Sequence, residues 1–114
     1  MANPPKRKGT AFESAVVAHI EAHGLPARRV ALAGSADQGD IHVWDGDGSL
    51  HVLECKNRRG YAIAEAVAQA KREAENAGSM WPVAVLKRNG VGDVGRSFVV
   101  MELDDWLAGL RRPF

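Results

Sequence analysis

The chain has 114 residues, of which 46% are hydrophobic and 25% charged, with 15 Lys and Arg against 14 Asp and Glu. This length allows one hydrophobic core, and the balanced composition excludes a disordered, collagen-like or low-complexity chain. The sequence has neither the apolar core of a signal peptide nor a run near the ~20 apolar residues that a membrane span requires. Its single cysteine, Cys55, has no partner for an internal disulfide, so we expect a cytoplasmic protein.

Basic residues are clustered along the chain although the net charge is only +1. The clusters are Lys6-Arg7-Lys8, Arg28-Arg29, Lys56 with Arg58-Arg59, Lys71-Arg72, Lys87-Arg88 and Arg111-Arg112. Such pairs are as often solvated loop ends as nucleic-acid contacts. If several acids gather at one place, however, the remaining surface is more basic than the total charge suggests.

Residues 1–9 contain two prolines and three basic residues without apolar periodicity, and they predict a flexible basic arm. A helix is expected from Thr10, because Thr10 and Glu13 form a capping-box pattern and Gly24 suits the position after the helix. Glu13 also projects into the apolar stripe of this helix, which consists of Phe12, Val16, Val17 and Ile20. A carboxylate directed toward the core needs a partner, so Glu13 is a candidate site residue as well as a capping residue.

A β-hairpin over residues 40–56 carries the residues of greatest chemical interest, after a strand over 27–32 and a polar loop over 33–39. If Gly46-Asp47-Gly48 is a three-residue loop with Gly48 at positive φ, Asp40 lies opposite Glu54. Asp40, Glu54 and Lys56 then share one face of the sheet, and Cys55 points to the other. A loop of two or four residues would place the two acids on opposite faces unless a bulge corrected the register.

The second half of the chain predicts a strand–helix–strand unit followed by a last strand and helix. The helix over 61–77 has a narrow apolar stripe, and the buried strand over 81–87 is expected to run parallel to the hairpin's second strand. A glycine-containing loop, a strand over 97–101 and a short helix from Asp104 complete the chain. The order α-β-β-β-α-β-β-α predicts an α/β or α+β protein, one domain over residues 10–114, with a central mixed sheet flanked by helices.

Asp40, Glu54 and Lys56 suit the hydrolysis of a phosphodiester. This reaction needs positive charge near the phosphate oxygens and an aligned water, which Mg²⁺ or Mn²⁺ on oxygen ligands supplies. Asp40 and Glu54 are the expected metal ligands, the backbone carbonyl of Cys55 adds a third oxygen, and Lys56 can orient the water or stabilise developing charge. Glu-x-Lys alone is a weak signal, because exposed strands often pair acids with bases. Asp37 competes with Asp40 as a ligand, although the strand that continues from Asp40 favours Asp40.

These motifs resemble those of the PD-(D/E)XK nuclease superfamily, and most closely its small Holliday-junction-resolvase-like members of archaeal and phage type. The matching segments, which lie between Lys6 and Leu103, are Lys8-Gly9-Thr10-Ala11-Phe12-Glu13, Gly39-Asp40-Ile41, Glu54-Cys55-Lys56-Asn57 and the helix that contains Gln69. Gly39 stands where the superfamily has its name-giving proline. The resemblance implies a restriction-endonuclease-like core with Asp40 and Glu54 as metal ligands, Lys56 as the catalytic lysine and Glu13 assisting metal or water binding.

The resemblance further implies a Mg²⁺- or Mn²⁺-dependent endonuclease that cuts branched DNA, such as a four-way junction, as a homodimer. Ser35 matches a serine that precedes the acid in such resolvases, and Gln69 matches a helix glutamine of related nucleases. Contacts to DNA are expected from Lys6, Arg7, Lys8, Ser35, Arg58, Arg59 and Gln69. A nickase, flap, single-strand or restriction-type nuclease of the same fold is the nearest alternative, and a non-catalytic DNA-binding protein is a second one, which the intact acids and lysine disfavour.

Overall fold

The computed structural model describes residues 4–31, 36–57 and 62–111, with side chains from Gly9 onward in the first of these segments. The elements are α1 (Pro4–Ala22), β1 (Ala27–Arg29), β2 (Ile41–Trp44), β3 (Leu50–Lys56), α2 (Ile63–Ala77), β4 (Trp81–Leu86), the 3₁₀ turn η1 (Val94–Arg96), β5 (Phe98–Val100) and α3 (Leu103–Arg111). The predicted order of helices and strands is therefore confirmed. Within the described part of the chain, no helix has the length and apolar character needed to cross a membrane.

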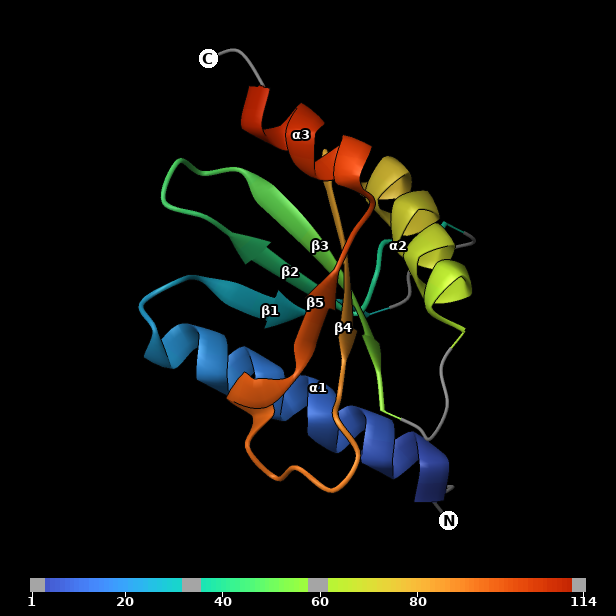
Figure 1. Cartoon of the computed structure of the whole chain (residues 1–114). Helices are drawn as coiled ribbons and strands as arrows, with labels where there is room; N and C mark the ends of the chain where they lie inside the picture. Colours follow the sequence, from blue (N-terminus) through green and yellow to red (C-terminus); the bar gives the residue numbers. More distant parts are fainter. Residues whose placement is uncertain (1–3, 32–35, 58–61, 112–114) are drawn as a thin grey trace.

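The five strands form one mixed sheet in the order β1-β2-β3-β4-β5 (Figure 1). Neighbouring strands are antiparallel except for β3 and β4, which run parallel and are joined through α2, as predicted. The carboxyl ends of β3 and β4 consequently lie at the same edge of the sheet. The protein is thus α+β, with three helices around a mixed sheet.

The predicted start of the first helix at Thr10 is wrong, because residues 4–9 already belong to α1. Proline is compatible with the first turn of a helix, where its missing N–H would have no partner, and Lys and Arg are good helix formers. The flexible arm expected over residues 1–9 is therefore not seen at 4–9, and residues 1–3 lie outside the described part. Thr10 lies inside the helix and does not cap it.

The two faces of the sheet are covered by different helices (Figure 1). On one face, Phe12 and Val16 of α1 pack against strand residues Ile41, Val43, Leu53, Val83 and Val85. On the other face, Ala66 and Val67 of α2 pack against Ala84 and Leu86. The alternation of Val83, Ala84, Val85 and Leu86 between the clusters follows the two-residue period of a strand. Each face of β3 therefore meets its own helix, which brings α1 and α2 to the hairpin from opposite sides.

The turn between β2 and β3 has the predicted three-residue loop. Gly48 has a φ of +80°, and the Asp45 N–H donates to the Ser49 carbonyl over 3.0 Å. The strands pair Ile41 with Leu53 and Trp44 with Leu50, which places Asp40 opposite Glu54. The predicted register of the hairpin is thus confirmed.

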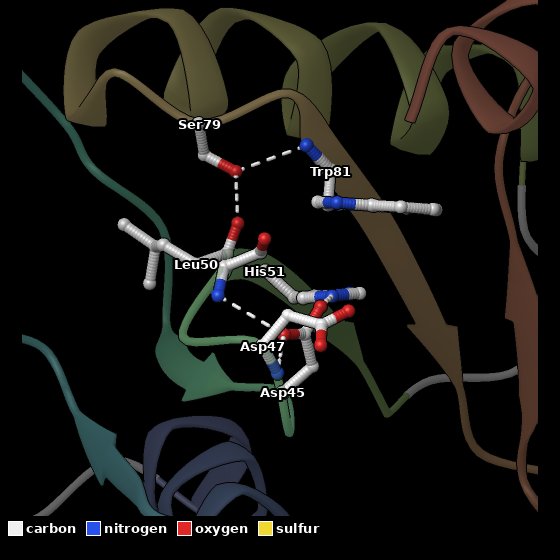
Figure 2. A network of polar contacts seen from close by, with 7 residues as sticks. Asp45, Asp47, Leu50, His51, Ser79 and Trp81 are labelled. Carbon is white, nitrogen blue, oxygen red and sulfur yellow. Dashed lines mark hydrogen bonds and ion pairs between the residues drawn. The ribbon is translucent and has the colours of Figure 1, made fainter. Parts of the chain in front are cut away.

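The Asp45 carboxylate holds this turn in place (Figure 2). Its Oδ1 accepts hydrogen bonds from the backbone N–H groups of Asp47 (2.9 Å) and Ser49 (3.0 Å), and its Oδ2 lies 2.8 Å from His51 Nε2. The His51 ring stacks on Trp81 with the ring centroids 4.6 Å apart. Because Trp81 is the first residue of β4, these contacts anchor the turn to the neighbouring strand.

We expect Asp45→Asn to lower the free energy of unfolding at neutral pH. The hydrogen bond from His51, followed by that from the Ser49 backbone, lowers the pKa of the Asp45 carboxyl below its ordinary value of 3.8. A folded-state pKa below the unfolded value stabilises the protein above the unfolded pKa, and this contribution is lost as the pH falls through the folded-state pKa. Urea unfolding should therefore show a difference between wild type and variant at about pH 7 that shrinks toward about pH 3.

Asp47→Asn is the matched control, since the Asp47 side chain is exposed and only its backbone N–H binds Asp45. A loss from Asp47→Asn equal to that from Asp45→Asn would contradict the assigned role of the Asp45 carboxylate.

Candidate functional site

Asp40, Glu54 and Lys56 meet where β2 begins and β3 ends. Glu54 is 3% exposed, and its Oε2 lies 3.5 Å from Lys56 Nζ. Asp40 lies close enough for its charge to raise the pKa of Glu54, and Asp40 Oδ2 accepts a hydrogen bond from the Cys55 N–H over 2.8 Å. The structure therefore brings together the three residues predicted to carry the chemistry.

Gly39 directs the chain into β2 just before Asp40. Its φ is +96°, and a Cβ at this position would lie 2.6 Å from the Val52 side chain and 3.3 Å from the Leu53 carbonyl oxygen. Its N–H donates to Asp37 Oδ1 over 2.9 Å. Proline has a φ near −65°, so it could not adopt this backbone conformation. Both the backbone angle and the available space call for glycine where the name-giving proline was expected.

Glu13 approaches the cluster from α1. Its Oε1 lies 3.3 Å from a terminal nitrogen of Arg29 in β1 and accepts a hydrogen bond from Arg29 Nε. Burial raises the pKa of the Glu13 carboxyl, the charge of Asp40 raises it further, and Arg29 opposes both effects. Glu13 is thus near Asp40, as the sequence predicted, and its ion-pair partner Arg29 is a residue that the sequence did not mark as part of the site.

Gln69 and Glu73 of α2 complete the cluster on the face of the sheet that Glu54 and Lys56 share, which is the face opposite α1. Lys56 Nζ donates to Gln69 Oε1 over 2.9 Å, and Gln69 Nε2 donates to Glu73 Oε2 over 3.1 Å. Gln69 was predicted from the sequence, as a DNA contact, but Glu73 was not. The signal for Glu73 was present, because it follows Ala70 by one helical turn and so falls in the apolar stripe of α2.

Glu73 is unusually buried for an acid, at 2% exposure. Its Oε1 has no hydrogen-bond donor among the residues that the structure describes, and its carboxyl faces those of Asp37 and Glu54. Two carboxyl groups in contact can form a hydrogen bond only when one of them carries a proton. Asp37 lies next to Glu73 in the cluster, since its carboxylate accepts the Gly39 N–H and its charge raises the pKa of Glu73.

The cluster concentrates carboxyl groups in a poorly solvated place. Burial raises the pKa of Glu54 to about 10, the neighbouring Asp40 carboxyl acts in the same direction, and Lys56 opposes them. Burial and the charge of Asp37 raise the pKa of Glu73 to about 7. Carboxylates this close repel one another when all are ionised, and a bound divalent cation would relieve that repulsion.

The oxygen ligands at this site are of the kind that a hard divalent cation binds. Carboxylate and carbonyl oxygens are the ligands that Mg²⁺ prefers, and Asp40 and Glu54 supply them on adjacent strands. Within residues 4–31, 36–57 and 62–111, however, no three His, Cys, Asp or Glu side chains already converge to hold a metal ion. Since burial raises the pKa of Glu54 well above its ordinary value, the Glu54 carboxyl would have to lose its proton before it could act as a metal ligand.

Cys55 lies between the two catalytic candidates on β3 but faces α1. Its side chain packs against the core cluster of α1, and burial raises the pKa of its thiol, with Asp40 adding to the effect. An uncharged thiol in such surroundings is a poor nucleophile. The role of the Cys55 backbone carbonyl as a third oxygen ligand stays a prediction.

Several predicted DNA contacts fall outside the described structure. Ser35, Arg58 and Arg59 lie in undescribed segments, and the side chains of Lys6, Arg7 and Lys8 are likewise not described. Comparison of the chain with protein-family models, with curated proteins and with solved structures finds no match. A function for the chain therefore has to be inferred from the geometry of its own residues.

We expect Glu54→Gln to stabilise the metal-free protein at alkaline pH. Because the folded-state pKa of Glu54 lies above its ordinary value of 4.5, the folded protein retains a proton that the unfolded chain releases. Stability should therefore fall as the pH rises from about 5 to about 9. Glutamine mimics the protonated carboxyl, so the variant should be more stable than the wild type at about pH 8, measured by urea unfolding with a chelator present.

Added Mg²⁺ should raise the midpoint of unfolding of the wild type but not of Glu54→Gln, because ligands that bind only the folded state stabilise it. Glu65→Gln, an exposed substitution on α2, serves as the control and should follow the wild type in both experiments. An unchanged pH dependence in Glu54→Gln would show that Glu54 is not the group that retains the proton.

Proposed function

We propose that the protein is a metal-dependent endonuclease of the PD-(D/E)XK type that hydrolyses phosphodiester bonds in branched DNA. The observation that carries this proposal is the meeting of Asp40, Glu54 and Lys56 at one edge of the sheet, with Glu54 buried and 3.5 Å from Lys56. The hairpin, the preceding helix with Glu13 and the parallel β3–β4 pair support a restriction-endonuclease-like core.

Asp40, Glu54 and the Cys55 carbonyl would hold Mg²⁺ or Mn²⁺. When bound, such a cation neutralises charge on the phosphate and lowers the pKa of a water molecule. Lys56 orients the attacking water or stabilises the negative charge that develops on the phosphate. Its hydrogen bond to Gln69 and its contact with Glu54 keep the ammonium group directed at the reaction site.

A basic and partly aromatic groove lies at the same edge of the sheet and supports DNA as the substrate. The Lys87 N–H donates to the Lys56 carbonyl over 3.0 Å, so the residues after β4 lie beside the end of β3, which carries Glu54 and Lys56. A groove of about 340 Å³ is lined here by Ile63, Leu86, Lys87, Arg88, Asn89 and Phe98. Cationic side chains bind phosphates, and exposed aromatic rings stack on unpaired bases. This combination favours a DNA with unpaired or splayed nucleotides near the cut.

Other basic clusters contribute less than their sequence suggests. Lys71 Nζ lies 2.6 Å from Glu102 and 3.5 Å from Asp105, and Arg29 is paired with Glu13. The Arg88 guanidinium, by contrast, lies over the Phe98 ring at 5.0 Å from its centroid, inside the groove. We further propose that two copies act as a homodimer, since a four-way junction is resolved by two cuts and a two-fold dimer presents two identical sites.

We expect Lys56→Met to abolish metal-dependent cleavage while DNA binding persists. Removal of a group that stabilises developing charge typically costs about 100-fold or more in turnover. The test compares cleavage of four-way junction, flap, single-stranded and linear duplex DNA in Mg²⁺, Mn²⁺ and chelator, with the junction cut fastest by the wild type. Lys71→Met, which removes a lysine engaged by Glu102 and Asp105, is the matched control and should retain activity.

Wild-type cleavage by Lys56→Met would sink the mechanism assigned to the lysine. Faster cutting of flap, single-stranded or linear DNA would instead establish another nuclease activity of the same site, and binding without metal-dependent cleavage would favour a non-catalytic DNA-binding protein.

We expect Arg88→Ala to weaken junction binding and to reduce its salt dependence. Without the Arg88 guanidinium, one phosphate fewer is neutralised, so the slope of log K against log salt should fall by about 1. Fluorescence anisotropy with a labelled junction across a salt series measures both quantities. Arg111→Ala, which changes the last residue of α3 at the opposite end of the sheet (Figure 1), should leave the slope unchanged. Equal slopes for wild type and Arg88→Ala would place the DNA elsewhere.

A further inference from the structure

Glu73 is a buried acid that the proposed reaction does not use. It is 2% exposed on α2, beside Gly39, where a Cβ would come within 3.8 Å of its Oε1. Burying an acid costs free energy unless hydrogen bonds or charged partners compensate for its lost solvation. Its hydrogen bond to Gln69 leads directly to Lys56, which links Glu73 to the proposed catalytic lysine.

The Gln69 amide can satisfy both of its partners in only one orientation. Lys56 is a donor without an acceptor atom in its side chain, so it must meet the amide oxygen. An ionised Glu73 carboxylate is only an acceptor, so it must meet the amide nitrogen. The observed bonds, 2.9 Å from Lys56 Nζ to Oε1 and 3.1 Å from Nε2 to Glu73 Oε2, agree with this orientation.

We propose that Glu73 is a positioning residue that fixes the Gln69 amide, so that the amide oxygen holds the Lys56 ammonium beside Glu54. The spacing suits this role, because residues four apart on a helix lie on the same face and Gln–acid pairs form there. Both residues approach β3 from the same side, with Glu73 the deeper of the two, so the burial of Glu73 keeps water from competing for the amide nitrogen. This proposal rests on the proposed nuclease function for its kinetic test only.

Glu73→Gln is the variant that removes the contribution of Glu73 to this preference. The new amide can donate as well as accept, so only Lys56 still favours the observed orientation of the Gln69 amide. Loss of a residue that orients a reacting group typically lowers activity about ten- to hundredfold. We expect that fall in kcat for junction cleavage, with KM unchanged. Glu75→Gln, an exposed substitution on the same helix, is the matched control and should behave as the wild type.

The exchanged pair Gln69→Glu with Glu73→Gln provides a rescue. It keeps the total charge, presents a carboxylate to Lys56 and lets the new glutamine donate to that carboxylate. Recovery of most of the lost kcat supports the positioning role, whereas a folded exchange variant as slow as Glu73→Gln overturns it. If Glu73→Gln alone does not fold, the kcat of the exchange variant is compared with that of the wild type, and a value close to the wild type supports the positioning role.

A second readout does not depend on catalysis. In metal-free urea unfolding, the effects of Glu73→Gln and Lys56→Met should be non-additive, because the two residues act through one shared amide. Additive effects, together with an unchanged kcat in Glu73→Gln, overturn the proposal. If the wild type cuts none of the DNA structures, the proposed function fails while the non-additivity still tests the link from Glu73 to Lys56.

Discussion

The hydrogen bonds of the Asp45 carboxylate determine the register of β2 against β3, and the candidate site depends on that register. Side chains alternate between the faces of a strand, so a slip of one residue would carry Asp40 to the face opposite Glu54. The three-residue loop with Gly48 at positive φ prevents this slip. The His51–Trp81 stack extends the constraint to β4, whose far end carries the basic groove. A structural element at one end of the sheet thus positions chemical groups at the other.

The site formed by this register is unfavourable for the empty protein. Glu54 and Glu73 are buried acids whose pKa values are raised chiefly by loss of solvation, and Lys56 offsets only part of the charge near Glu54. Protons retained by these groups stabilise the metal-free fold, whereas their ionised forms are what a divalent cation needs. Folding of the metal-free protein and the proposed binding of a metal would therefore favour opposite protonation states of Glu54.

Elements and faces were predictable from the sequence because they follow from short-range rules. The two-residue period of strands and the helical stripe correctly gave the facing of Cys55 and the approach of Glu13. The three-residue loop was preferred because it groups the two acids with the lysine, and the structure has the register that follows from it. Arg29 was missed because its role comes from a pairing with Glu13 across distant segments, which no local pattern shows. Glu73 was missed although its position in the apolar stripe of α2 marked it as a buried acid. The start of α1 was misjudged because prolines and basic residues suggest a flexible arm, although both are compatible with a first helical turn.

Gly39 shows how this chain positions Asp40 without the proline expected from the motif. Proline would restrict φ to a value near −65°, whereas Gly39 turns the chain at +96° and lets Val52 and the Leu53 carbonyl approach closely. The Asp37 carboxylate accepts the Gly39 N–H and so stabilises the turn before Asp40. The same turn places Gly39 against Glu73, on the face where Gln69 holds Lys56. The absence of a side chain at Gly39 therefore leaves room for both Val52 and the buried carboxyl of Glu73.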